Sequence, residues 1–371
     1  MLDESIFKAY DIRGIYSENL DEDVAEDIGR AFVKHLDLSG SRVVVARDMR
    51  ISGETLEKAF IQGVTQAGAD VLDLGLVSTD ALYFAVGHLE EPGGAMVTAS
   101  HNPKDYNGFK LCREEAIALS GDAGLGQIRD LIVSGDLPDP AKYPGSVEET
   151  DITVDYAKHC LSFIETEDLR PLKIVIDAGN GMAGKMVPPI FEHLPFEYAP
   201  MYFELDGTFP NHPPNPIEPE NVRELQERVV AEDADFGVAF DGDADRCFII
   251  DENGTTISGD LARPHSEERA GEGAGRDHTV QRGLLEGLPR ARRARGREGH
   301  KDQGRPLHHQ AADAKTRRGL RRGALSPLLL QGQLLRRLRH HRHADHSRAR
   351  RPPGRAYLQA PLPHRSLRPL G

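Results

Sequence analysis

The chain of 371 residues has no tryptophan and only three cysteines, Cys112, Cys160 and Cys247. Cysteines this few and this scattered argue against a disulfide framework or a zinc site. The sequence contains no run of 18 apolar residues, which argues against a membrane-spanning helix. Its acidic start, MLDESIFKAY, lacks the apolar segment of a signal peptide. We therefore expect a cytoplasmic protein that does not enter a membrane.

Residues 263–371 lack isoleucine, phenylalanine and methionine, and their single valine is Val280. They hold 26 basic and 9 acidic side chains, a net charge of +17, whereas residues 1–262 hold 20 basic and 50 acidic side chains, a net charge of −30. Strands and packed cores are built mainly from β-branched, aliphatic and aromatic residues. Residues 263–371 are therefore predicted to form a poorly structured basic tail.

Helix-like and strand-like segments alternate through residues 1–262. Apolar residues at helical spacing predict helices, and short apolar runs predict buried strands. The predicted helices are Asp21–Leu36 (with Asn19 or Asp21 as its cap), Glu54–Ala69, Val154–Thr166, Lys185–His193 and Pro219–Ala231. The predicted strands are Arg42–Ala46, Val71–Leu76, Gly94–Thr98, Lys173–Asp177 and Phe236–Phe240. This alternation predicts α/β domains with mixed, largely parallel sheets.

A segment rich in proline, glycine and glutamate, PDPAKYPGSVEET, interrupts the alternation near residue 148. It predicts a first domain at residues 1–148 and a second at residues 149–251. Ligands of such sheets gather at the carboxyl ends of the strands, so polar segments that follow a strand are the candidate sites.

The segment FDGDADR, residues 240–246, places Asp241, Asp243 and Asp245 at every second position between two apolar runs. Carboxylates clustered at a strand end suit a small, hard cation such as Mg²⁺, which takes oxygen ligands. A solvated acidic turn is the alternative interpretation. An EF-hand loop is excluded, because its sixth position would be Arg246 instead of glycine.

Ser100 follows the predicted strand Gly94–Thr98 in the segment TASHNP, with NGFK shortly after it. No G-x-S-x-G motif surrounds Ser100, so a serine hydrolase triad is not supported. The hydroxyl of Ser100, the imidazole of His101 and the ammonium of Lys110 are groups that can hold and move a phosphoryl group. Taken singly, His101 is more often a loop-stabilising donor and Lys110 is more often solvent-facing.

The segment GNGMAG, residues 179–184, matches the G-x-G-x-x-G pattern of dinucleotide-binding turns. It lies between a predicted strand and a predicted helix, so a nicotinamide-dependent oxidoreductase is an alternative. The match is in the middle of the chain, and the acidic residue expected about twenty positions later is ambiguous between Glu197 and Glu204. We interpret the segment as a tight strand-to-helix turn.

Four motifs together resemble the α-D-phosphohexomutase family, and in particular its bacterial phosphomannomutase/phosphoglucomutase branch. They are FKAYDIRG at Phe7–Gly14, TASHNP with NGFK, DGTFPNHPPNP at Asp206–Pro216, and DGDADR. The resemblance extends from Met1 to about Ala262. It implies an isomerase that interconverts hexose 1-phosphates and hexose 6-phosphates, of mannose or glucose, through a phosphoserine and a hexose 1,6-bisphosphate. We also expect a monomer that binds no nucleic acid.

The resemblance also implies roles for individual residues. Ser100 is the expected phosphoserine, and its phosphate is expected to bind Mg²⁺ together with the three aspartates. Lys110 is the expected general acid and base, assisted by His101 and Arg13. Tyr10 and Arg246 are expected to line the substrate site. We further expect the oxygen atoms of Ser100 and the nearest aspartate to lie within about 8 Å, the span of a bridging phosphate and metal.

Beyond Ala262 the sequence departs from the family, whose third domain should supply a G-E-H-S sugar-recognition loop and which has a fourth domain. Residues 252–371 are thus predicted to be the start of a third domain followed by the tail, with no fourth domain. A nucleic-acid arm and a natural disordered extension are alternatives for the tail. Permitted codons for Leu328–His346, read one nucleotide later, encode YYFKDNYYADSGIIAMLI, which resembles the family's third domain. Codons for Arg317–Pro327 admit a G-E-H-S loop in the same frame. We therefore predict a frameshift near Ala262 and an impaired enzyme.

Overall fold

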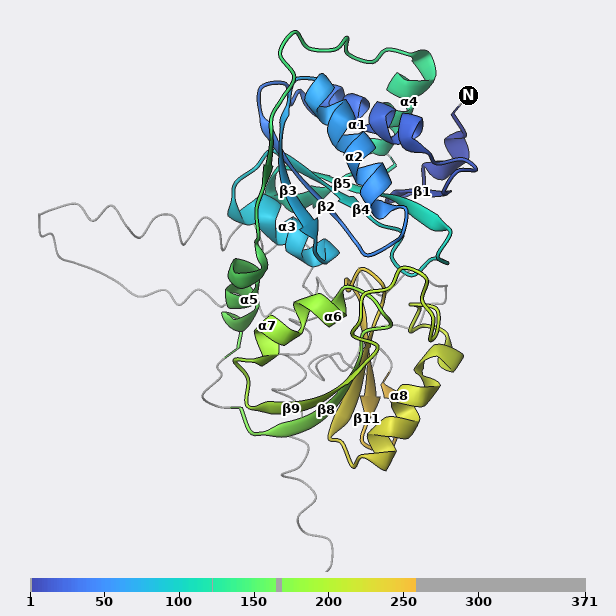
Figure 1. The fold of residues 1–371 in the computed structure, drawn as a ribbon, viewed down its shortest axis with the longest axis vertical. Helices are drawn as coiled ribbons and strands as arrows, with labels where there is room; N and C mark the ends of the chain where they lie inside the picture. The colour runs from blue at the N-terminus through green and yellow to red at the C-terminus, as the bar shows by residue number, and fades with distance from the viewer. Residues whose placement is uncertain (1, 122, 165–168, 258–371) are drawn as a thin grey trace, which may run out of the picture.

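The computed structural model describes residues 2–121, 123–164 and 169–257, and its fold is drawn in Figure 1. The predicted frameshift near Ala262 and the predicted tail lie outside the described residues, as does most of the predicted third-domain segment. None of the described helices has both the length and the apolar character that crossing a bilayer requires.

The first part of the chain builds a mixed sheet of seven strands. They are β1 (Ile12–Ile15), β2 (Arg42–Arg47), β3 (Asp70–Leu76), β4 (Gly93–Val97), β5 (Tyr106–Arg113), β6 (Ile117–Ala118) and β7 (Val147–Glu149). Their order is β1-β5-β4-β2-β3-β7, with β6 beside β5. The strands β4, β2, β3 and β7 run parallel, whereas β5 is antiparallel to β4, β1 and β6.

Helices cover both faces of this sheet (Figure 1). One face carries α1 (Glu22–Leu36), α2 (Gly53–Gln66) and α4 (Leu125–Ser134), and the other carries α3 (Thr79–His88). Two short 3-10 turns, η1 (Glu4–Ile6) and η2 (Glu114–Ala116), complete this part.

The second part builds a five-stranded sheet in the order β12-β11-β10-β8-β9. The strands are β8 (Leu172–Asp177), β9 (Phe196–Met201), β10 (Phe236–Phe240), β11 (Cys247–Asp251) and β12 (Thr256–Ile257). The strands β9, β8 and β10 are parallel, and β11 is antiparallel to both of its neighbours. The helices α5 (Thr153–Leu161), α6 (Ala183–Met186) and α7 (Pro188–Phe191) lie between the two sheets, and α8 (Pro219–Ala231) lies on the far face (Figure 1). The prediction of mixed, largely parallel α/β sheets is confirmed.

Local sequence explains where most predicted elements begin and end. The start of α1 is capped by Asp21, whose carboxylate accepts the Val24 N–H at 3.0 Å. The predicted helix Lys185–His193 is instead divided into α6 and α7, because Pro188 has no N–H to continue the helical hydrogen bonding. The strand β5 was not predicted, because Asn107, Gly108 and Lys110 interrupt its apolar pattern.

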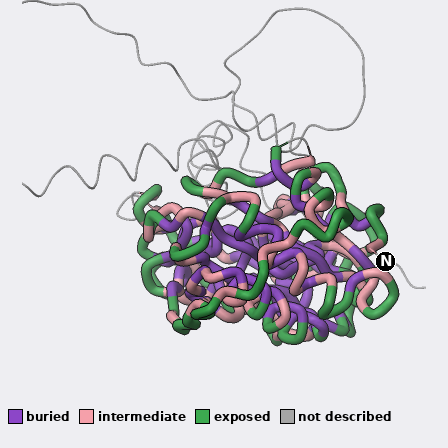
Figure 2. The backbone as a smooth tube through the Cα atoms, turned by 90° about the horizontal axis from the view of Figure 1, so that it is seen from above, coloured by how far each residue is buried: buried purple, intermediate pink, exposed green. Residues whose placement is uncertain are grey.

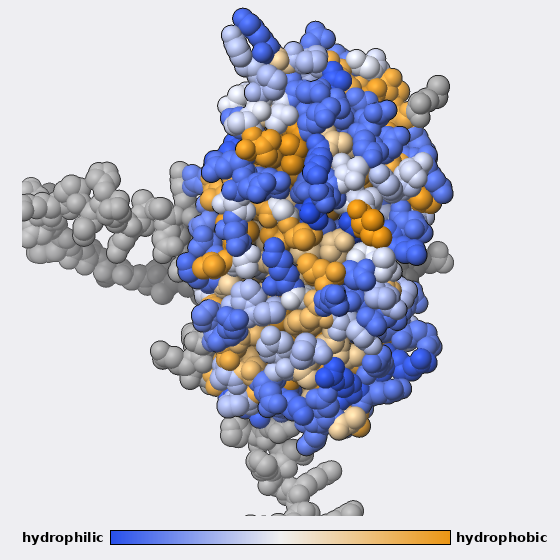
Figure 3. Space-filling view, viewed as in Figure 1, coloured by the Kyte–Doolittle hydropathy of each residue, from blue (hydrophilic) through white to orange (hydrophobic). Residues whose placement is uncertain are grey.

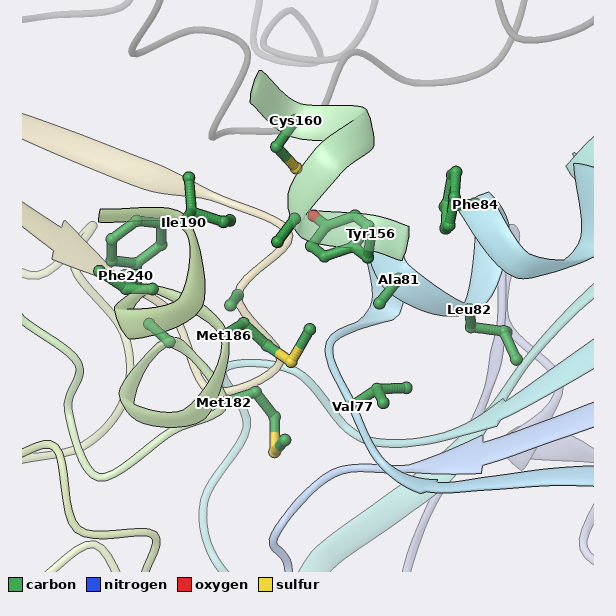
Figure 4. Close-up of a cluster of buried hydrophobic side chains, with 14 of the residues drawn as sticks. Val77, Ala81, Leu82, Phe84, Tyr156, Cys160, Met182, Met186, Ile190 and Phe240 are labelled. Carbon is green, nitrogen blue, oxygen red and sulfur yellow. The ribbon is translucent and has the colours of Figure 1, made fainter. Parts of the chain in front are cut away.

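Alternating residues of the strands face two different cores. In β2, Val43 and Val45 pack under α1 and α2, whereas Val44 faces the space between the sheets. In β8, Val175 packs against α8, whereas Ile176 faces the same space. The side chains between the sheets form one continuous core, which Figure 4 shows from α3 across α5 to α6 and α7. The two sheets therefore share a layer of helices.

Burial follows this arrangement. Buried backbone runs through the centre of the described part, and exposed segments lie around its outside (Figure 2). On the face drawn in Figure 3, apolar residues form separate patches among hydrophilic ones.

Candidate active site

The predicted site residues meet where strands of both sheets end. Ser100 follows β4, and Asp241 follows β10. The Ser100 hydroxyl donates a hydrogen bond to Asp241 Oδ2 at 2.7 Å, across 141 positions of sequence. This distance confirms the prediction that Ser100 and the aspartates lie at one place. Ser100 is buried and has a φ of 52°, which is uncommon for a residue with a side chain.

Arg246 lies against both partners of this contact. Its guanidinium donates to Ser100 Oγ at 2.7 Å and, through Nε, to Asp241 Oδ2 at 2.9 Å. Its backbone N–H donates to Asp241 Oδ1 at 3.0 Å. The guanidinium of Arg246 therefore lies directly beside the Ser100 hydroxyl and the Asp241 carboxylate.

Asp241, Asp243 and Asp245 each offer a carboxylate oxygen, and these oxygens lie within 4.8 Å of one another. Asp241 and Asp243 are fully buried, and Asp243 Oδ1 has no hydrogen-bond partner in the described part of the chain. Buried carboxylate oxygens without a donor are costly unless a cation satisfies them. The group thus has the oxygen donors and the spacing to bind a metal ion.

The charges of the site also favour the binding of a cation. Three carboxylates face two cationic side chains, Lys110 and Arg246, which leaves one negative charge uncompensated in a buried place. Burial, with the neighbouring charges of Asp243 and Asp245, raises the pKa of Asp241 well above its usual range. A proton or a divalent cation can relieve this charge, and bound cations invert local pKa behaviour.

Lys110 comes from the middle of β5 and bridges two of the aspartates. Its Nζ donates to Asp243 Oδ2 at 2.6 Å and to Asp245 Oδ2 at 2.5 Å. Burial alone would lower the pKa of Lys110, but the charges of Asp243 and Asp245 outweigh it and raise the pKa well above its usual value. Lys110 is therefore an ammonium, a proton donor, in this arrangement.

His101 lies next to Ser100 in the same loop. Its Nδ1 is 3.4 Å from Ser100 Oγ and also contacts the Arg246 guanidinium. Burial, with the charges of Arg246 and Arg13, lowers the pKa of His101 to about 4. Its imidazole is consequently neutral at neutral pH and can accept a hydrogen bond.

Arg13 contacts the residues around Ser100, whereas Tyr10 does not share in the hydrogen bonds that the described residues make there. Arg13 donates to the Asn102 side chain and to Asp11 Oδ2, the latter at 2.6 Å, so it contacts the Ser100 loop. Tyr10 is 73% exposed. The structure places Tyr10 on the surface, outside the hydrogen-bonded group around Ser100.

Two residues of the site were missed by the sequence analysis. Thr79, at the start of α3, donates its hydroxyl to Asp243 Oδ2 at 2.6 Å. Arg50, just after β2, donates to the carbonyl of Ser100 at 2.8 Å. The segment after β2 could have been found, because parallel strands end at the same edge of a sheet.

The GNGMAG segment supports the aspartate loop. It forms the predicted turn after β8, and the helix that follows has only four residues. The Met182 N–H donates to the Gly242 carbonyl at 2.9 Å, and a Cβ on Gly181 would lie 2.6 Å from that oxygen. The glycine at position 181 therefore permits a close approach to the aspartate loop.

The comparisons with known proteins agree with this geometry. The model of phosphoglucomutase/phosphomannomutase, alpha/beta/alpha domain I, matches residues 4–137. The model of domain II of the same family matches residues 154–254. Domain I therefore precedes domain II along this chain.

Curated relatives and a solved structure extend the match. A phosphomannomutase of Escherichia coli strain K12 is 45% identical over 260 residues, covering 68% of this chain and 56% of the relative. A protein named phosphohexose mutases from Xanthomonas campestris pv. campestris is 45% identical over 253 residues, with the same two shares. The X-ray structure of a phosphoglucomutase/phosphomannomutase family protein from Burkholderia thailandensis has a TM-score of 0.65 and 40% identity, and covers 71% of this chain and 58% of that chain.

This chain spans about half the length of the curated relatives it matches. The matches include the Ser100 loop and the aspartate loop, which the fold brings into contact. The chain belongs to the α-D-phosphohexomutase family, in its bacterial phosphoglucomutase/phosphomannomutase branch.

Proposed function

We propose that this chain carries the phosphoryl-transfer half of a phosphohexomutase, an isomerase that interconverts hexose 1-phosphates and hexose 6-phosphates. The observation that supports this most directly is the hydroxyl of Ser100, which lies between the Asp241 carboxylate and the Arg246 guanidinium. Such a hydroxyl can hold a phosphoryl group next to both a cation-binding carboxylate and a fixed positive charge.

The proposed transfer balances as follows. The bond between Ser100 Oγ and phosphorus breaks, and a bond from phosphorus to a sugar hydroxyl oxygen forms. The proton of the sugar hydroxyl passes to a base of the protein, and the departing Ser100 oxygen takes up a proton. The product is a hexose 1,6-bisphosphate, and the reverse transfer of its other phosphate regenerates phosphoserine. Little covalent chemistry is required beyond this, so alignment and charge neutralisation supply most of the rate.

Asp241, Asp243 and Asp245 would hold the divalent cation, which we propose to be Mg²⁺. Bound there, with an oxygen of the serine phosphate, Mg²⁺ would offset negative charge on the phosphoryl group. Arg246 would neutralise the same oxygens from the other side, since it already contacts Ser100 Oγ.

We propose that Lys110 acts as general acid and base at the sugar hydroxyl, assisted by His101 and Arg13. Its ammonium must give up a proton before it can accept one. Lys110 Nζ lies 2.6 Å from Asp243 Oδ2, and His101 Nδ1 lies 3.4 Å from Ser100 Oγ, so both groups are close to the Ser100–Asp241 contact. Arg13 contacts the loop through Asn102, and the exposed Tyr10 would meet a sugar at the surface.

The complete mutase cycle also needs the bisphosphate to be held while it reverses. Residues 263–371 match neither family model, and their composition differs from that of residues 1–262. We therefore propose that the chain as written is an impaired mutase. A fragment that binds a cation without any phosphoryl transfer is the alternative.

Mass spectrometry of the chain after incubation with glucose 1,6-bisphosphate and Mg²⁺ tests the proposed half-reaction. One phosphate on Ser100, absent from Ser100→Ala, is the expected result, and cation binding without phosphate incorporation would establish the alternative. A coupled assay of glucose 1-phosphate conversion, on this chain and on one with its reading frame restored near codon 262, tests the impairment. Equal rates from the two chains would contradict it.

A further inference from the structure

Arg50 is buried, and its side chain has no measurable exposure. A guanidinium so deep in a protein must find acceptors for its donors and a partner for its charge. Its nearest carboxylate is Asp48, with an Nε–Oδ2 distance of 3.4 Å. Its remaining donors are directed at the backbone.

The backbone that Arg50 contacts is the Ser100 loop. Nη2 donates to the carbonyl oxygens of Ser100 at 2.8 Å and Asn102 at 2.7 Å. Nη1 donates to those of Pro103 at 2.7 Å and Tyr106 at 2.9 Å. Four carbonyls of one seven-residue loop thus converge on a single side chain. The planar fork of arginine makes this possible, whereas the ammonium of lysine could not match it.

The same side chain also reaches the second part of the chain. The Arg50 guanidinium carbon lies 5.2 Å from the centre of the Phe209 ring, which belongs to the DGTFPNHPPNP segment. In that segment a Cβ on Gly207 would lie 2.6 Å from the Met49 carbonyl oxygen, so the two segments are packed backbone to backbone. Arg50 therefore joins the Ser100 loop to the half of the site that carries the aspartates.

The loop needs such support because its conformation is unfavourable by itself. Ser100 has a positive φ of 52°, a region that residues with a side chain occupy only when surrounding contacts hold them there. A second set of bonds works from the other end: Ser100 N–H donates to Thr98 Oγ1 at 2.8 Å, and Thr98 donates to Asp48 Oδ2 at 2.6 Å. Asp48, through Thr98, and Arg50 thus both fix the conformation of the Ser100 loop.

We propose that Arg50 is a positioning residue for phosphoryl transfer. Its guanidinium fixes the backbone of residues 100–106, which keeps Ser100 Oγ opposite Asp241. It touches neither the phosphoryl group nor the cation. The phosphorylation part of the test rests on the proposed function, whereas the loop-holding part does not.

The test compares Arg50→Met and Arg50→Lys with Arg47→Met. Arg47 is the matched control: it lies three residues earlier, and its guanidinium bonds the buried Glu57 of α2 at 2.8 Å instead of the Ser100 loop. Three quantities are measured on the full chain. They are the amide exchange rates of residues 100–106, the rate of Ser100 phosphorylation by glucose 1,6-bisphosphate, and the affinity for Mn²⁺ alone.

Arg50→Met should raise exchange in residues 100–106 about tenfold more than in β2 and β4, since the loop would open locally. It should lower the phosphorylation rate about 100-fold, because a misplacement near 1 Å costs that much. Mn²⁺ affinity should stay within about twofold, because the aspartates are held by other residues. Arg50→Lys should fall between the wild type and Arg50→Met. A merely structural role would raise exchange throughout the fold and lower both the phosphorylation rate and the Mn²⁺ affinity, as we expect for Arg47→Met.

Loop exchange and phosphorylation in Arg50→Met that match those of Arg47→Met would overturn the proposal. If the wild-type chain takes up no phosphate, the proposed function fails, and loop exchange alone decides the role of Arg50. If Arg50→Met does not fold, Phe209→Leu replaces it. That variant removes only the ring beneath the guanidinium and should shift exchange of residues 100–106 in the same direction; no shift would count against Arg50.

Discussion

The hydroxyl oxygen of Ser100 lies 2.7 Å from Oδ2 of Asp241. The two residues follow strands of different sheets, so this contact requires the carboxyl ends of β4 and β10 to face each other. The shared layer of helices produces that arrangement by packing both sheets against one core. The position of the proposed phosphoryl carrier relative to Asp241 therefore depends on how the two sheets pack.

Ser100→Ala removes the only atom that we propose to carry phosphate. Incubation with glucose 1,6-bisphosphate should then leave the protein mass unchanged, whereas the wild type should gain one phosphate. The free energy of unfolding should fall by about 1–3 kcal/mol, since the hydroxyl's hydrogen bonds with Asp241 and Arg246 are both lost. Ser134→Ala, at the exposed end of α4, is the control and should be phosphorylated normally. Phosphate on the Ser100→Ala protein would contradict the phosphoserine mechanism.

Asp243→Asn should weaken binding of Mg²⁺ or Mn²⁺ at least about tenfold, because even residues that only support metal ligands have effects of that size. Titration calorimetry of the chain with each ion measures this directly. Asp233→Asn is the control, since Asp233 is exposed and its left-handed backbone suits asparagine. Equal affinities for the two variants would show that the three aspartates do not form the cation site.

Gly181→Ala should displace the aspartate loop. The added Cβ would lie 2.6 Å from the Gly242 carbonyl oxygen, closer than real contacts allow. We expect a loss of roughly 1–3 kcal/mol in the free energy of unfolding, the usual cost of overpacking, together with weaker Mn²⁺ binding. Gly121→Ala is the control, because its nearest contact would be 3.7 Å. Urea unfolding and Mn²⁺ titration check the two effects. An unchanged Mn²⁺ affinity would show that the turn at Gly181 does not position the aspartates.

His212→Gln should reduce the loss of stability at alkaline pH. His212 Nε2 lies 3.0 Å from Asp177 Oδ2, and its Nδ1 lies 2.8 Å from the Pro213 carbonyl oxygen. Burial alone would lower the pKa of His212, but the bond to Asp177 outweighs it and raises the pKa. The protonated imidazole therefore stabilises the fold below the unfolded pKa, near 6.5, and this stabilisation is lost as pH rises through the folded value.

Urea unfolding at several pH values between 6 and 9 measures this effect in the wild type and in His212→Gln. Burial and Asp73 raise the pKa of Glu57 to about 7, so Glu57 also favours folding at low pH, and only the difference between the two proteins isolates His212. Parallel pH profiles would mean that His212 does not titrate with folding.

The sequence predicted elements whose residues carry their own signal. The helix α8 and the strand β10 occur at the predicted residues. Apolar residues at helical spacing and a proline at the first helical position define α8, and a short apolar run defines β10. The strand β5 lacked such a signal: Asn107, Gly108 and Lys110 interrupt its apolar pattern, and it forms because β1 and β4 supply hydrogen bonds on both sides.

The same distinction holds for the site. Ser100 and the aspartates were predicted because each lies in a short motif after a strand. Thr79 and Arg50 were not, because their partners are far away in the sequence: the Thr79 hydroxyl bonds an aspartate 164 positions later, and Arg50 bonds carbonyls at least 50 positions later. Such contacts arise only once the sheets are assembled. The end of β2 could have indicated the segment of Arg50, but no local pattern indicates its partners.

The helical layer between the sheets has a practical consequence for dissecting this protein. Phe84 of α3 and Tyr156 of α5 are buried in it, with ring centres 5.7 Å apart. Expressing either sheet alone would uncover this apolar layer to water, and exposed surfaces of that kind promote self-association. A protein that contains only one of the two sheets should therefore precipitate or oligomerise under conditions in which the protein with both sheets remains in solution. The two sheets are best expressed as a single recombinant protein.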